Sequence, residues 1–172
     1  IVDLPDNVDP LFSAVATRYT HIVAPNEDLI QILIQDDFTD EQILHARRVL
    51  ESYLVDIPGS EWGSNKAPIA NAIATTNAIL FLLNDETEYD NPDLWELIDS
   101  GVQGQDLLAT EVHPEGSSAY MNSSQRDATY EEVLHYVHGY GIQLVSPGMQ
   151  NAIESAMSEA IENEYYEPLS DL

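Results

Sequence analysis

Apolar residues recur at helical spacing in the segment that follows Thr39. The run Thr39-Asp40-Glu41-Gln42 has the form of a capping box, in which the first and fourth residues satisfy each other's backbone N–H groups. Behind it, the apolar positions lie three and four residues apart: Ile43, Leu44, Ala46, Val49, Leu50, Tyr53 and Leu54. This spacing predicts an amphipathic helix that ends before Pro58-Gly59.

A second helix is predicted over Ala67–Leu83. Pro68 suits its first turn, where a backbone N–H would have no partner within the helix. The segment is nearly uncharged, so we expect this helix to lie centrally in the fold. The acidic loop Asn84–Asn91 follows, and Asn91-Pro92-Asp93 predicts the start of a short helix that runs through Ile98.

Two short runs with strand-like composition come next. They are Leu107–Val112 and Ser117–Met121, and Pro114-Glu115-Gly116 separates them. Because Pro and Gly mark turns, the pattern predicts two strands in a hairpin or at a sheet edge. If these runs are not strands, the chain is a purely helical adaptor.

The remaining segments complete the expected architecture. A helix is predicted from Thr129 to about His138, where glycines interrupt the pattern, and another begins at Ser146-Pro147 and continues to about Tyr165. Ile1–Pro10, with two prolines, is predicted to be extended. We therefore predict one domain over residues 1–172, of the α+β class, dominated by helices and with a small antiparallel sheet.

The charge of the chain excludes some classes of function. The chain has 31 acidic against 5 basic residues, a formal net charge of −26, and no cysteine. Such a charge repels the phosphates of nucleic acid and anionic lipid, and no apolar run approaches the ~18 residues that a membrane-spanning helix needs. Self-repulsion on this scale requires screening ions, so we expect a secreted or extracellular protein from halophilic, marine or calcium-rich surroundings. The chain begins at Ile1, so we expect that a leader was removed or that the chain is part of a longer protein.

One helix carries candidate chemistry. At about 100° per residue, Glu131, His135 and His138 share one face of the helix from Thr129, and Glu132 lies at the edge of that face. Thr129 and Glu132 also have the spacing of a capping box. Without cysteine, a metal must be held by His, Asp or Glu, and two residues four apart on a helix can hold one ion. This face therefore predicts a divalent-metal site, although a solvated acidic face would have the same pattern.

This part of the chain resembles Glu-type zincin metallopeptidases of the lethal-factor-like group. The resemblance rests on the segment Glu131-Glu132-Val133-Leu134-His135, which reads EExxH in place of HExxH, and on the predicted order of a strand followed by two helices. The resemblance covers residues 104–164 and includes Gln150–Ala156, which is similar to the helix that supplies the third ligand. A second resemblance links the run 126–132 to uncharacterised surface proteins of marine bacteria.

The zincin resemblance implies a zinc ion with His135 and Glu154 as ligands, Glu132 as the catalytic base and a peptide or protein as substrate. Glu131 replaces the first histidine of the family motif, which makes the site more anionic, and His138 is an alternative ligand. The competing hypothesis is a non-catalytic structural or interaction module of a larger extracellular acidic protein.

The other candidates have simpler interpretations. Asn84–Asn91 and the cluster Asp36, Asp37, Asp40 and Glu41 are rich in oxygen ligands that suit structural calcium, but acidic residues also gather at helix N-termini. We expect no functional role for the remaining histidines, which are His21, His45 and His113.

Overall fold

The computed structural model describes residues 1–5, 8–122 and 126–165. Its centre is a five-stranded sheet in the order β1-β2-β3-β4-β5. The strands are β1 (Val2–Asp3), β2 (Arg18–Val23), β3 (Leu29–Ile34), β4 (Ile79–Leu83) and β5 (Gly104–Leu108). The first three pair antiparallel, whereas β3, β4 and β5 run parallel, so β5 is an edge strand.

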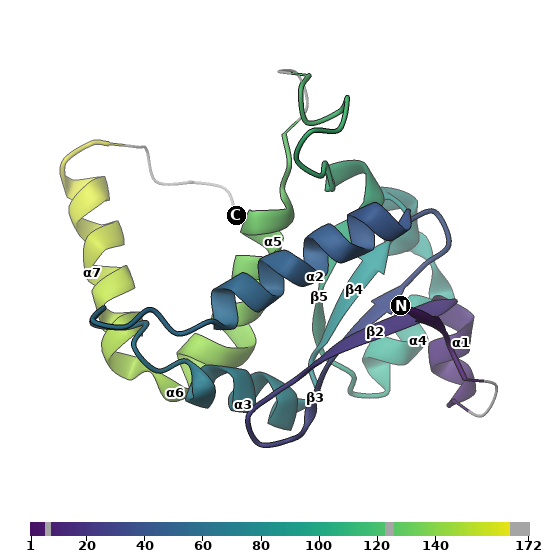
Figure 1. The fold of residues 1–172 in the computed structure, drawn as a ribbon, viewed down its shortest axis with the longest axis horizontal. Coiled ribbons are helices and arrows are strands. Elements are labelled where there is room, and N and C mark those ends of the chain that lie inside the picture. Colours follow the sequence, from purple (N-terminus) through teal and green to yellow (C-terminus); the bar gives the residue numbers. More distant parts are fainter. Residues whose placement is uncertain (6–7, 123–125, 166–172) are drawn as a thin grey trace.

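Helices occupy both faces of this sheet (Figure 1). They are α1 (Pro10–Val15), α2 (Asp40–Leu54), α3 (Ala67–Thr76), α4 (Pro92–Asp99), α5 (Thr129–Val137), α6 (Gln143–Val145) and α7 (Pro147–Glu162). The described residues also form two short 3₁₀ helices, η1 (Glu86–Asp90) and η2 (Ala109–Glu111), and one π-helical turn, η3 (His138–Ile142). Among the described residues, no helix is both long and apolar enough to cross a bilayer.

Strand β4 divides the core into two clusters. Because successive side chains of a strand point to opposite faces, Leu80 and Leu82 pack with α2, α3 and α5, whereas Ile79, Phe81 and Leu83 pack with α1 and α4. All five residues of β4 are buried. A strand that is covered on both faces and paired on both edges is the natural centre of a three-layer domain.

The prediction of one helix over Ala67–Leu83 was wrong in its second half. Helix α3 ends at Thr76, Asn77 adopts a left-handed backbone with φ of 54°, and the chain then enters β4. Asparagine tolerates this conformation better than most residues, so it turns the chain out of the helix. A fully buried strand is apolar at every position, and its sequence does not alternate.

The predicted hairpin of Leu107–Val112 with Ser117–Met121 was also wrong. Leu107 and Leu108 end β5, residues 109–111 form η2, and the second run contains turns and no strand. The sheet is mixed and not antiparallel, because β4 pairs in parallel with both β3 and β5. The helix-rich α+β class with a small sheet is confirmed.

Several other elements begin where the sequence pattern predicts them. The Thr39 capping box is present at the start of α2, and α4, α5 and α7 begin within one residue of their expected positions. The expected extended segment Ile1–Pro10 contains the two-residue β1 but also the first residue of α1, and its residues 6–7 lie outside the described part. Helix α7 stands apart from the body in Figure 1, and none of its residues is buried in the described structure.

Candidate metal site

Helix α5 is held firmly against the core by one of its faces. Val133, Tyr136 and Val137 are buried, and the Tyr136 hydroxyl donates a hydrogen bond of 2.7 Å to the carbonyl oxygen of Ala78, just before β4. This contact ties the helix to the end of the neighbouring α3–β4 connection. The opposite face of α5 is therefore presented outward in a defined orientation.

The start of α5 differs from the expected capping box. Thr129 is completely buried and its hydroxyl donates to Asp127 Oδ1 at 2.6 Å, while Ala128 takes the N-cap position without a side-chain hydrogen bond. The carboxylate of Glu132 accepts instead from Gln105 Nε2 of β5, at 3.0 Å. Glu132 is thus turned toward the sheet edge rather than back to the helix start.

Three candidate ligands on α5 converge on one another. Glu131, Glu132 and His135 each offer one ligand atom, and these atoms lie within 4.8 Å of one another. Glu131 and His135 are exposed, whereas Glu132 is half-buried. Two carboxylates and one imidazole suit zinc and similar divalent ions, and three ligands from one side leave other coordination positions open to water.

The surroundings of Glu132 are strongly acidic. Burial raises the pKa of its carboxyl above the ordinary value, the nearby His135 acts in the opposite direction, and the charges of Glu111, Asp106 and Glu131 raise the pKa further. The cause is that the anion loses hydration and meets other anions. A bound cation would relieve both effects.

Glu131 already has a cationic partner. Its carboxylate accepts a hydrogen bond from the guanidinium of Arg126, in an ion pair whose side chains are 44% and 76% exposed respectively. An exposed pair of this kind adds little stability. Arg126 therefore competes with a metal ion for Glu131 without enclosing the site.

His138 and Glu154 lie outside the converging group. The His138 ring nitrogen Nε2 is 2.7 Å from Gln150 Oε1, and the amide of Gln150 donates to Glu154 Oε1 at 2.8 Å. These bonds direct the His138 imidazole toward α7. Of the residues expected at the site, the structure therefore brings together Glu131, Glu132 and His135, and it joins the other two to each other through Gln150.

His45 has a role that the sequence interpretation missed. It is 9% exposed, and its Nε2 lies 2.9 Å from Asp127 Oδ2. His113 is also buried, and its backbone N–H donates to the other oxygen of Asp127 at 3.1 Å. The available signal was the place of His45 on the apolar face of α2, because a polar group there requires a buried partner.

The two acidic segments considered for calcium have structural tasks. Asp85 accepts the backbone N–H of Thr87 at the start of η1, and Asp40 and Glu41 occupy the first turn of α2. Asp36 accepts a hydrogen bond from the Asn84 side chain, which lowers the pKa of its carboxyl. These contacts agree with the interpretation of acidic residues at helix N-termini.

Comparison with known proteins adds no relative from which a role can be transferred: no family model, no curated protein and no solved structure matches the chain.

Proposed function

We propose that this chain is an extracellular divalent-cation-binding domain whose site is formed by Glu131, Glu132 and His135. The observation that carries the proposal is the convergence of three ligand atoms within 4.8 Å on a helix that is anchored to the core. The crowding of carboxylates around Glu132 supports it, because repulsion among anions is removed when a cation binds. The excess of acidic residues also attracts cations from a distance.

Zinc is the ion that this ligand set favours. Calcium prefers six or more oxygen ligands, whereas the group includes an imidazole nitrogen and only two carboxylates. Zinc accepts such a mixture in tetrahedral geometry, with water at the remaining position. Manganese is the nearest alternative, since it also binds carboxylate and imidazole.

Metal titration tests this proposal directly. Zinc chloride added to the metal-free protein in a calorimeter should bind with one ion per chain, and His135→Ala should weaken binding by more than about tenfold. His21→Ala is the matched control, because His21 lies on β2, away from α5. Equal zinc affinity in the wild type and in His135→Ala would exclude the site.

Peptide hydrolysis is a second candidate function, in a zincin-like arrangement. It is supported by the raised pKa of half-buried Glu132, which is typical of a catalytic acid or base, and by the order of the edge strand β5, helix α5 and helix α7. In this role Glu131 and His135 would hold a metal ion that supplies Lewis-acid chemistry, and Glu132 would act as the general base. Glu132 would then be the base and not a metal ligand, and another group would take its place in the coordination of the metal.

One substitution separates the two roles of Glu132. If Glu132 is a base, Glu132→Gln keeps zinc and loses cleavage of a peptide library; if it is a ligand, the same change weakens zinc binding. Glu131→His restores the family motif HExxH and should strengthen zinc binding. If the wild-type chain and the Glu131→His variant both bind zinc but cleave no peptide, the function that remains is that of a non-catalytic binding module.

A further inference from the structure

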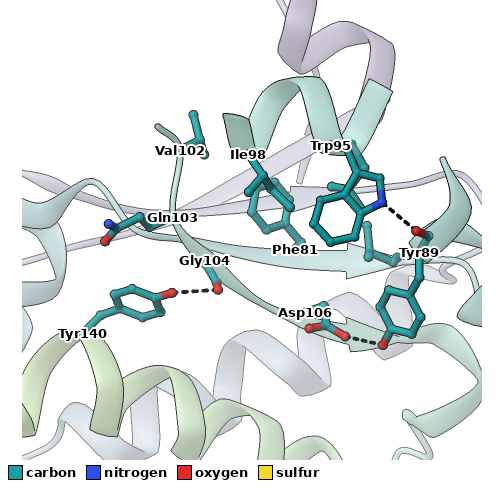
Figure 2. Close-up of a pocket in the computed structure, with 11 residues that line it drawn as sticks. Phe81, Tyr89, Trp95, Ile98, Val102, Gln103, Gly104, Asp106 and Tyr140 are labelled. Atoms are coloured by element: carbon teal, nitrogen blue, oxygen red, sulfur yellow. Dashed lines mark hydrogen bonds between the residues drawn. The ribbon is translucent and has the colours of Figure 1, made fainter. Parts of the chain in front are cut away.

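A cavity lies beside strand β5, on the sheet face that α4 covers (Figure 2). Its volume is about 540 Å³, within the range of small-molecule sites. Aromatic rings and aliphatic side chains form most of its wall: Phe81, Leu83, Tyr89, Leu94, Trp95, Ile98, Val102 and Tyr140. Asp106 is the only charged residue among the described residues that line it.

Hydrogen bonds fix the orientation of the rings. The Trp95 indole N–H donates to the carbonyl oxygen of Tyr89 at 2.6 Å, and the Tyr140 hydroxyl donates to the carbonyl oxygen of Gly104 at 2.8 Å. In Figure 2, Trp95 and Tyr89 lie at one end of the cavity, Tyr140 lies at the other, and Asp106 lies between them. Because the polar edges of these rings are already bonded, their remaining surface is carbon, with the electron-rich faces of the π systems.

The carboxylate of Asp106 has unused capacity. Its Oδ2 accepts the Tyr89 hydroxyl at 2.7 Å, while Oδ1 accepts no hydrogen bond within the described part of the chain. The pKa of Tyr89 is raised by burial, by its bond to Asp106, and by the charges of Glu111 and Glu86. Several carboxylates thus act on this end of the cavity, and no lysine, arginine or histidine is among the described residues that line it.

We propose that this cavity binds a small organic cation, an alkylammonium group attached to an apolar body. An anion is disfavoured by Asp106 and its acidic neighbours. A bare divalent metal is disfavoured as well, because the wall offers one carboxylate where such an ion requires several oxygen ligands. An ammonium group matches both features, since it pairs with the carboxylate and is attracted to the faces of Trp and Tyr, while its carbon substituents contact the aliphatic wall.

Choline is a suitable probe, with 3,3-dimethylbutanol as its neutral counterpart of the same shape. Trp62→Phe leaves Trp95, which is 50% exposed, as the single tryptophan that reports binding by fluorescence. In metal-free protein at 0.15 M salt, choline should change the fluorescence and bind about tenfold more tightly than the neutral alcohol. Equal affinity for the two compounds, or no binding of either, would overturn the proposal.

Two charge variants locate the interaction. In the same background, Asp106→Asn keeps an oxygen that can accept the Tyr89 hydroxyl but removes the charge, and it should weaken choline binding about tenfold. Glu159→Gln removes the same charge from exposed α7 and should leave affinity unchanged. An equal loss of choline affinity in both variants would show general attraction to an acidic protein and would exclude a specific site. The comparison of choline with the neutral alcohol does not depend on either variant.

Discussion

His45 Nε2 and Asp127 Oδ2 lie 2.9 Å apart and join the middle of α2 to the segment that leads into α5. The other oxygen of Asp127 accepts hydrogen bonds from the backbone N–H of His113 and from the hydroxyl and backbone N–H of Thr129. One side chain thereby connects α2, the segment at His113 and the start of α5. Because Thr129 begins α5, Asp127 also sets the position of the candidate metal ligands.

Asp127→Asn should destabilise the domain by about 1.5–3 kcal/mol, since it weakens charge-assisted hydrogen bonds at a site with little solvent. The side chain of Asp127 is only 7% exposed. Urea denaturation followed by circular dichroism measures the change. Asp37→Asn, at an exposed position, is the control and should change stability by less than about 0.5 kcal/mol.

The same variant tests a pH effect. Burial raises the pKa of Asp127, but hydrogen bonds from the Thr129 hydroxyl, from His45 and from the backbone of His113 and Thr129 outweigh it, so the pKa is below the ordinary value. A lowered folded pKa stabilises the fold above the unfolded value of about 3.9, and this stabilisation is lost as pH falls through the folded pKa. The difference in Tm between wild type and Asp127→Asn should therefore shrink on acidification below about pH 4. A constant difference would contradict this assignment.

In the metal-free chain, the ionised carboxylate of Glu132 should destabilise the fold, whereas that of Asp127 stabilises it. Its pKa is raised, mainly by burial, so its ionised form is less stable in the fold than in the unfolded chain. Glu132→Gln should therefore raise the Tm of metal-free protein at neutral pH, and the gain should vanish below the unfolded pKa of about 4.3. A lower Tm for Glu132→Gln at neutral pH would mean that its bond with Gln105 outweighs the charge.

Removing Arg126 should strengthen metal binding. The guanidinium is paired with Glu131, and a metal must displace it to use that carboxylate. Because an exposed pair is worth about 0.2–1 kcal/mol, Arg126→Gln should tighten zinc binding up to about fivefold. Arg48→Gln, which removes the same charge from an exposed position of α2, is the comparison in calorimetry. If both variants bind zinc alike, the pair with Glu131 has no specific influence.

Salt should stabilise the domain. The net charge of −26 creates repulsion throughout the fold, and the Debye length falls from about 10 Å at 0.1 M to about 3 Å at 1 M. The Tm should rise steadily with sodium chloride over this range. A Tm that is independent of salt would show that the acidic side chains are already neutralised by bound ions.

Local signals predicted some elements well. Helix α2 combines a capping box with apolar residues on one face, and both features act within a few residues of one another. Strand β4 was misassigned because Ile79, Leu80, Phe81, Leu82 and Leu83 are all apolar, and such a run suits a buried helix as well as a buried strand. Pairing with β3 and β5 stabilises this segment as a strand, and the local sequence pattern does not reveal that pairing.

The candidate site divides in a similar way. Helical spacing brings Glu131 and Glu132 close to His135, because they lie four and three residues before it on α5. His138 follows the last residue of that helix, and its ring is set by Gln150 on α7, a tertiary contact. The link between His45 and Asp127 joins different segments, so the position of His45 on the apolar face of α2 could indicate the need for a partner without identifying it.

The π-helical turn η3 also constrains the number of residues in this part of the chain. Its wide turn, closed by a hydrogen bond from the Gln143 N–H to the His138 carbonyl, holds one residue more than an α-helical path would. Loss of one residue there would let the chain close an α-helical turn between the same ends, and each position within the turn would then hold a different residue. Tyr140 would leave the Gly104 carbonyl, and a side chain would replace Gly141, where even a Cβ would come within 2.6 Å of Ile69. Because Tyr140 and Gly141 must each keep their place, insertions and deletions that a surface loop accepts should not be tolerated in this turn.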